Sequence, residues 1–177
     1  MPLFYSIVYL SVLLLLLFVL ARTAYAFFIG APILYTPKKA IRDGLNFCGV
    51  KAGDKFYDLG AGSGRSMVIA AKEFGAVPTG FELSPIFFAL TKLNLIFSGV
   101  RSYDLRMDNF YAQSLDEADC VFCFLTPKAM KKLAPKFAAE LTSGAKIISY
   151  GFQLPDRQPD KIINNGYPGN VFCYTVE

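Results

Sequence analysis

Three glycines spaced two residues apart are the feature of the sequence with the clearest chemical meaning. Gly60, Gly62 and Gly64 follow a short apolar run that carries Asp58, in the stretch DLGAGSGR. Residues without side chains let a ligand lie directly against the backbone, and residues 66–74 then have the pattern of a helix whose N-terminus faces that space. We therefore predict a binding corner for a nucleotide-like ligand, with the glycines in contact with it.

Polar side chains also follow the next apolar runs, each at the point where a strand is expected to end. They are Glu82 after the second run, Asp108 and Asn109 after the third, and Thr126 and Pro127 after the fourth. In an open parallel sheet, ligands bind beyond the carboxyl ends of the strands. We therefore expect these side chains to share one edge of a sheet with the glycines.

Several other kinds of site are disfavoured by the residue types. Arg65 stands where a dinucleotide fingerprint needs its last glycine, and no Lys-Ser or Lys-Thr follows the glycines, so neither NAD nor a P-loop is expected. The chain contains no histidine, which removes Ser-His and Cys-His nucleophiles. Cys120 and Cys123 would point to opposite faces of a strand, so we expect no metal site and four structural thiols in a reducing compartment.

Short apolar runs alternate with helical segments from residue 51 onward. This alternation is typical of an α/β fold in which helices cover both faces of a parallel sheet. We expect strands over 55–59, 77–82, 101–107, 118–125, 145–150 and 171–176. Helices are expected over 66–74, 85–97 and 127–141, where Pro135 could split the last one, and from about Thr36-Pro37 to Cys48.

The N-terminal region is almost purely apolar. The run from Leu3 to Leu20 carries no charge, and as a helix it would be about 27 Å long, close to the hydrocarbon thickness of a bilayer. A cleaved signal peptide is the alternative, because Ala24-Tyr25-Ala26 has the form of a cleavage site. No basic residue precedes the run, however, and the run is long for a signal peptide. We predict an uncleaved membrane anchor over residues 1–22.

Basic residues follow this anchor, and none precedes it. They are Arg22, Lys38, Lys39 and Arg42. The bias predicts a single-pass membrane protein whose globular domain, residues 36–177, lies on the cytoplasmic or matrix-equivalent side. Residues 23–35 form a juxtamembrane segment that either lies along the interface or packs on the domain. The basic cluster near anionic lipid also accounts for the net charge of +4, so no nucleic-acid partner is expected.

Taken together, Asp58 before G-x-G-x-G, Glu82 after the second strand and Asp108-Asn109 after the third resemble a class I S-adenosylmethionine-dependent methyltransferase. The resemblance covers residues 36–177. The stretches YTPKKAI, GFELSP, EADCVFCFLTPKAMKKLAPKFAAEL and PDRQPD are similar, more narrowly, to a membrane-anchored family of protein-lysine methyltransferases. That family includes the enzymes that act on the ATP synthase c subunit and on the adenine nucleotide translocase. The resemblance implies a Rossmann-like methyltransferase sheet.

The resemblance also implies S-adenosylmethionine as the cofactor and gives each polar residue a role. Asp58 would hold the amino group of the donor, Glu82 its ribose hydroxyls, and Asp108, beside Asn109, its adenine amine. Tyr35, Thr126 and Pro127 would shape the slot for the acceptor. No residue is singled out as the proton acceptor.

Two hypotheses from different classes remain for the function. A lysine of a membrane protein is favoured, and a lipid, a quinone or another small acceptor is the enzymatic alternative. A non-enzymatic nucleotide-binding protein that retains the fold is the alternative from another class.

Overall fold

A seven-stranded sheet forms the centre of the globular part. The structure is a computed structural model that describes residues 2–28 and 35–177. The strands are β1 (Lys55–Leu59), β2 (Val77–Phe81), β3 (Asp104–Arg106), β4 (Cys120–Cys123), β5 (Lys146–Tyr150), β6 (Lys161–Ile163) and β7 (Val171–Thr175). They lie in the order β3-β2-β1-β4-β5-β7-β6. The order reverses between β1 and β4, the kind of position where such sheets bind ligands.

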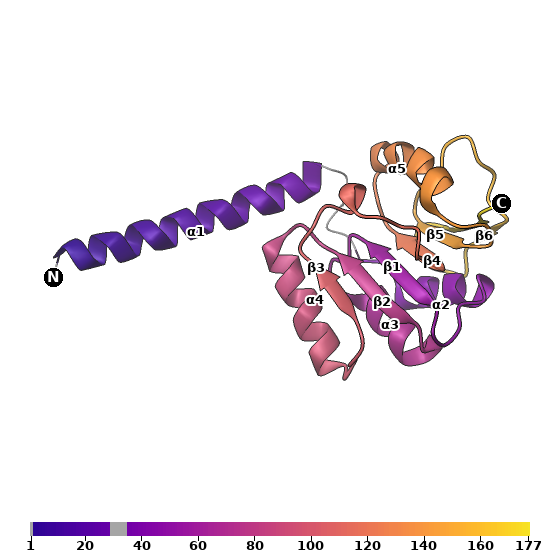
Figure 1. Ribbon diagram of the computed structural model, residues 1–177, viewed down its shortest axis with the longest axis horizontal. Helices are drawn as coiled ribbons and strands as arrows, with labels where there is room; N and C mark the ends of the chain where they lie inside the picture. Colours follow the sequence, from indigo (N-terminus) through magenta and orange to yellow (C-terminus); the bar gives the residue numbers. More distant parts are fainter. Residues whose placement is uncertain (1, 29–34) are drawn as a thin grey trace.

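The described residues 2–28 and 35–177 contain five helices besides the sheet. They are α1 (Pro2–Phe28), α2 (Lys38–Phe47), α3 (Arg65–Phe74), α4 (Pro85–Phe97) and α5 (Pro127–Glu140), and a 3-10 turn, η1 (Phe110–Ala112), follows β3 (Figure 1). Most lie within a few residues of the predicted ranges. Pro135 does not split α5, which runs through it as one helix.

Alternate residues of the central strands face opposite sides of the sheet. Phe56 of β1 belongs to a core that α2 and α3 close, whereas Tyr57 belongs to a core that α5 closes. A third, smaller cluster around Met67 and Leu95 joins α4 to α3. The prediction of helices on both faces is confirmed. Because both faces are covered, the residues of the central strands are apolar on both sides of the sheet.

The prediction of an all-parallel sheet is wrong at one edge. β7 runs antiparallel to β5, with Ile148 opposite Cys173, and it forms a hairpin with the unpredicted strand β6. A parallel pair needs a crossover connection that is usually a helix, and residues 151–170 contain none. The direction of β7 therefore follows from the connection that precedes it, and the apolar pattern of β7 does not indicate that direction.

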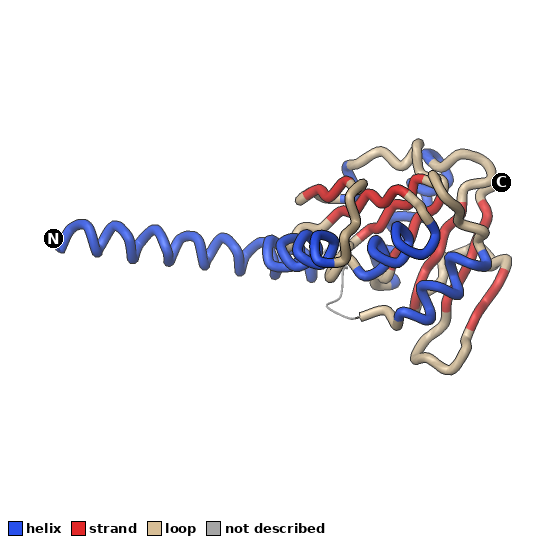
Figure 2. The backbone as a smooth tube through the Cα atoms, turned by 90° about the horizontal axis from the view of Figure 1, so that it is seen from below, coloured by secondary structure: helices blue, strands red, loops and turns tan. Residues whose placement is uncertain are grey.

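Helix α1 extends away from the sheet, as Figures 1 and 2 both show. Its residues Leu3–Tyr25 are long enough to cross a membrane, and an 18-residue window within them has a mean hydropathy of 2.7. The helix continues past Arg22 to Phe28, so it includes part of the predicted juxtamembrane segment, and residues 29–34 of that segment lie outside the described residues.

The C-terminal part of α1 touches the domain at the start of α4. Thr23 Oγ1 donates a hydrogen bond to Val19 O (2.8 Å) and lies 3.0 Å from Ser84 Oγ. Because the Thr23 proton is already used, the Ser84 hydroxyl is the donor of this second bond. Ser84 is also the N-cap of α4.

Candidate functional site

The glycine loop between β1 and α3 adopts a conformation that side chains rarely allow. Gly60, Gly62 and Gly64 have φ angles of 103°, 56° and 71°, all in the left-handed region. A Cβ added at Gly62 would meet nothing closer than a backbone oxygen at 3.8 Å, so the backbone there borders open space. A Cβ at Gly64 would lie 2.7 Å from Thr91 Cγ2, so this glycine is needed for the approach of α4.

Helix α4 holds the outer side of this loop. Thr91 Oγ1 donates to Gly62 O (2.7 Å), and Asn94 Nδ2 donates to Ser63 O (2.9 Å). Neither side chain was predicted from the sequence to belong to the site. A usable signal was present, because Thr91 and Asn94 are, with Lys92, the polar residues of a helix that is mostly apolar.

Glu82 links the loop to the end of β2. Its carboxylate oxygens accept hydrogen bonds from Gly62 N (2.9 Å) and Ser84 N (2.8 Å), and the side chain is 6% exposed. Burial raises the pKa of this carboxyl above its ordinary value, and the bonds from the backbone act against that rise. Each oxygen keeps acceptor capacity, so the residue can organise the loop and still bind two hydroxyl groups.

Asp58 is buried at the end of β1 and accepts a hydrogen bond from Ser66 Oγ in the first turn of α3. Burial, together with the nearby charge of Glu82, raises the pKa of Asp58 to about 7, although the Ser66 bond favours the charged form. An added cationic group would restore the ionised state. The site therefore suits a ligand with a positive amino group.

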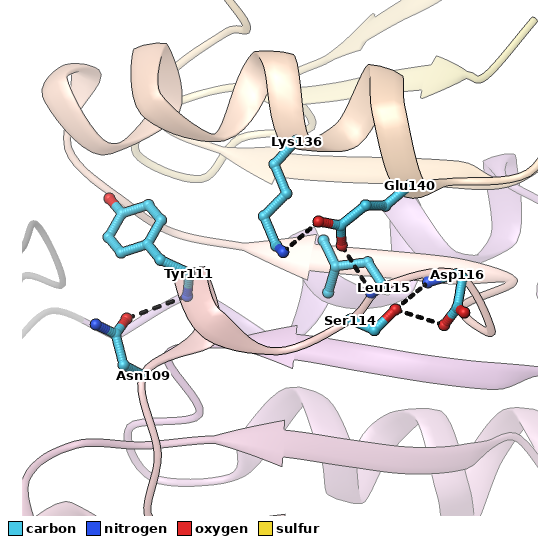
Figure 3. A network of polar contacts seen from close by, with 7 residues as sticks. All are labelled: Asn109, Tyr111, Ser114, Leu115, Asp116, Lys136 and Glu140. Atoms are coloured by element: carbon cyan, nitrogen blue, oxygen red, sulfur yellow. Dashed lines mark hydrogen bonds and ion pairs between the residues drawn. The ribbon is translucent and has the colours of Figure 1, made fainter.

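The carboxyl end of β3 lies next to Glu82. The two are joined by a hydrogen bond that Glu82 N donates to Arg106 O at 3.0 Å. Beyond it, Asp108 is exposed and accepts from Asn109 N (2.7 Å) and Gln113 Nε2 (2.8 Å). Asn109 caps η1 by accepting from Tyr111 N at 3.1 Å (Figure 3). Asp108 and Asn109 therefore lie at the expected edge and also shape the turn that follows β3.

The chain beyond η1 is fastened to α5. Leu115 N donates to Glu140 Oε2 (3.0 Å), and Lys136 forms an ion pair of 2.6 Å with the same carboxylate. Figure 3 shows these contacts together, with Ser114 and Asp116 closing the turn between them. This network fixes the course of the chain from the third strand end back to β4.

The predicted acceptor residues fall into two places. Tyr35 is 60% exposed, and the centre of its ring lies 5.1 Å from Cζ of Arg65. Arg65 is the first residue of α3 and follows the glycine loop directly. Thr126 instead caps α5 by accepting from Ala129 N (3.4 Å), and Pro127 is the exposed first residue of that helix. Thr126 and Pro127 follow the carboxyl end of β4, whereas Tyr35 contacts the glycine corner through Arg65.

The loop after β5 forms an open depression at the surface that the sequence did not predict. Its volume is about 420 Å³, and it is lined by residues 153–158. Asp156 has a φ of 57°, which is unusual for a residue with a side chain, and the Arg157 guanidinium donates to Thr175 O. In the sequence this segment contains the stretch PDRQPD of the family resemblance, and no pattern in it predicts a depression.

The two cysteines of β4 are buried in different cores. Cys120 belongs to the core under α2 and α3 and Cys123 to the core under α5, as their spacing predicts. Burial raises the pKa of both thiols, that of Cys123 to about 12. Among residues 2–28 and 35–177, no group of three His, Cys, Asp or Glu side chains could hold a metal ion.

Known proteins share this arrangement. The ANTKMT methyltransferase domain matches residues 58–161. A protein-lysine N-methyltransferase of Saccharolobus islandicus is 31% identical over 150 residues, which cover 82% of this chain and 93% of the relative. The adenine nucleotide translocase lysine N-methyltransferase of Mus musculus is 35% identical over 124 residues, covering 69% of this chain and 53% of the relative, so this chain spans about half of the mouse protein.

A solved structure shows a similar fold. The RNA methyltransferase from Salinibacter ruber, in complex with S-adenosyl-L-homocysteine, superposes with a TM-score of 0.77 at 28% identity. The match covers 81% of this chain and 94% of the other.

Proposed function

The chain belongs to the ANTKMT methyltransferase domain family, and from that premise we propose that it transfers a methyl group from S-adenosylmethionine to a lysine side chain of a membrane protein. Family membership makes it an S-adenosylmethionine-dependent methyltransferase. The lysine acceptor, the membrane location and the roles of individual residues belong to the proposal.

One observation carries the cofactor site: two buried carboxylates, Asp58 and Glu82, adjoin a glycine loop that borders open space. Asp58 would bind the amino group of the donor, and Glu82 would bind both ribose hydroxyls. Asp108, with Asn109, would accept from the adenine amine. The three glycines would let the donor lie against the backbone.

S-adenosylmethionine supplies a methyl group that is already electrophilic because it is bonded to a sulfonium sulfur. The protein then has to hold a neutral amine in line with the methyl–sulfur bond, and positioning alone contributes several kcal/mol. A lysine amine has an ordinary pKa of about 10.4, so it must lose a proton before it reacts, and an apolar slot lowers that pKa. Tyr35, Thr126 and Pro127 would shape such a slot.

The names of the relatives in Saccharolobus and in mouse support lysine as the acceptor. Helix α1 supports membrane attachment through a single span, and the basic residues that follow it favour the cytoplasmic or matrix-equivalent side for the domain. We propose the anchor over residues 1–22, the juxtamembrane segment over 23–35 and the catalytic domain over 36–177. An anchored enzyme meets membrane acceptors at a raised effective concentration.

The test is methyl transfer from labelled S-adenosylmethionine into native membranes, followed by mass spectrometry of the labelled species. We expect label on a lysine of a membrane protein, and we expect the Glu82→Ala variant to transfer almost none. Deletion of residues 1–21 should leave donor affinity nearly unchanged but greatly reduce labelling at low enzyme concentration.

Three results would contradict parts of the proposal. Label in the lipid extract would indicate a small acceptor, and donor binding without any transfer would indicate a nucleotide-binding protein. Equal labelling by the truncated and the full-length enzyme would remove the role of the anchor.

A further inference from the structure

Helix α4 exposes a continuous apolar stripe to solvent. Its members are Ile86, Leu90, Leu93 and Phe97, which are 53%, 40%, 50% and 84% exposed, with Ile96 beside them at 53%. Spacings of three and four residues place the four on one face of the helix. An apolar stripe of this length on a protein surface marks an interaction site far more often than chance exposure does.

The domain already uses the other face of the same helix. Thr91 and Leu95 are fully buried, Thr91 against the glycine loop and Leu95 in the cluster with Met67. Nothing in the described part of the domain covers the stripe. Helix α4 is therefore apolar on two sides and has a partner within the domain on only one of them.

The position of α4 indicates what covers the stripe. In Figure 1, α4 lies on the side of the domain from which α1 projects, and it runs across the direction of α1. Figure 2 shows the same relation from below. The contact of Thr23 with Ser84 joins the end of α1 to the start of α4. A bilayer crossed by α1 would therefore face α4.

The charges around the stripe suit an anionic lipid surface. Lys92 is the one charged residue of α4, Arg101 follows the helix, and the sequence has no acidic residue from Pro85 to Tyr103. Basic residues near the headgroups of anionic lipids are favourable, whereas carboxylates there would be repelled.

We infer that the apolar stripe of α4 inserts into the lipid interface beside α1 and seats the domain on the membrane. The inference rests on the proposed membrane anchor. It adds that α4 itself is a second membrane contact, and that the glycine corner, which the inner face of α4 holds, lies at the bilayer surface. The stripe would hold the domain against the lipid in addition to the contact of Thr23 with Ser84.

The absence of tryptophan from the chain allows a direct test. Leu93→Trp and Phe97→Trp place a single reporter on the stripe, Leu10→Trp places one within α1, and Ile162→Trp on β6 is a control with 52% exposure at the far edge of the sheet. The full-length variants are reconstituted in vesicles of anionic and zwitterionic lipid, with and without brominated acyl chains. Iodide in the aqueous phase serves as the second quencher.

An interfacial helix face lies roughly 5–10 Å below the headgroups, so bromine should quench the two stripe reporters about two-fold or more and leave Ile162→Trp unchanged. Quenching of Leu10→Trp alone would keep the anchor and refute the docking of α4. No quenching at any of these positions would refute both. Stripe reporters that are shielded from bromine and from iodide alike would show that a second copy of the chain covers α4, which also overturns the inference.

Discussion

Replacing Glu82 with alanine removes the group on which the cofactor assignment depends most. The carboxylate is buried and accepts one backbone hydrogen bond on each oxygen, from Gly62 and from Ser84. If it also accepts both ribose hydroxyls of the donor, the variant loses two charge-assisted hydrogen bonds at once. The net cost should be about 2–4 kcal/mol, which corresponds to a roughly 30- to 1,000-fold rise in Kd.

Calorimetric titration of the detergent-solubilised protein with S-adenosylmethionine and with its demethylated product measures this loss. Both ligands have the same ribose, so both affinities should fall by a similar factor. Asp104→Ala is the matched control, because Asp104 is an acid in the neighbouring strand whose ion pair with Arg106 is exposed. We expect its effect on donor affinity to be below about two-fold.

The variant also leaves two backbone N–H groups without their acceptor, at about 1–3 kcal/mol each where they are buried. Circular dichroism and a denaturant titration should therefore accompany the binding measurement. A folded Glu82→Ala protein that binds both ligands with unchanged affinity would refute the ribose assignment. Loss of affinity for only one of them would contradict it as well, because the ribose is common to both.

Two further predictions concern the stability of the site. A carboxyl whose pKa rises on folding, here from 3.8 to about 7 for Asp58, binds its proton more tightly in the folded state, so its contribution to stability falls as the pH rises through that interval. Asp58→Asn should therefore gain stability relative to the wild type, by up to about 4 kcal/mol, between about pH 4 and about pH 8 in urea titrations, and a constant difference across this range would contradict the assignment. Gly64→Ala should lose about 1–3 kcal/mol in the same assay, because its Cβ meets Thr91. Gly144→Ala, with φ of 88° but open space around it, should lose only the backbone part, and equal losses in the two variants would exclude the close approach of α4 as the reason for Gly64.

The corner around the glycines could be predicted because its signals are local. A short apolar run carries Asp58, and alternating glycines and a helical pattern follow it. This combination can be recognised without knowledge of any distant contact. Glu82 was predicted for the same reason, since it ends the next apolar run. The roles of these residues in binding stay predictions until the donor affinities are measured.

Features that depend on distant contacts were less accessible to sequence reasoning. The direction of β7 depends on which strand it joins, and the apolar pattern of β7 is compatible with a parallel or an antiparallel neighbour. The burial of Asp58 against Ser66 and the exposure of Asp108 both depend on the turn that follows each strand. The sequence shows that α4 carries apolar residues on more than one side, but only the fold shows which of these sides α3 leaves uncovered.

The hydrogen bonds of Ser84 connect two parts of the protein with different tasks. Its hydroxyl binds Thr23 of α1, and its backbone N–H binds the carboxylate that holds the glycine loop. If α1 crosses a bilayer, this connection sets the donor at a constant height above the lipid. Enzyme and acceptor would then meet by diffusion in two dimensions. Rotation about the membrane normal would be the main motion still needed to align the active site with the acceptor. An acceptor lysine would have to lie at that same height. The depth of a lysine in the membrane would therefore determine whether it can be methylated, ahead of any preference of the enzyme for the residues around it.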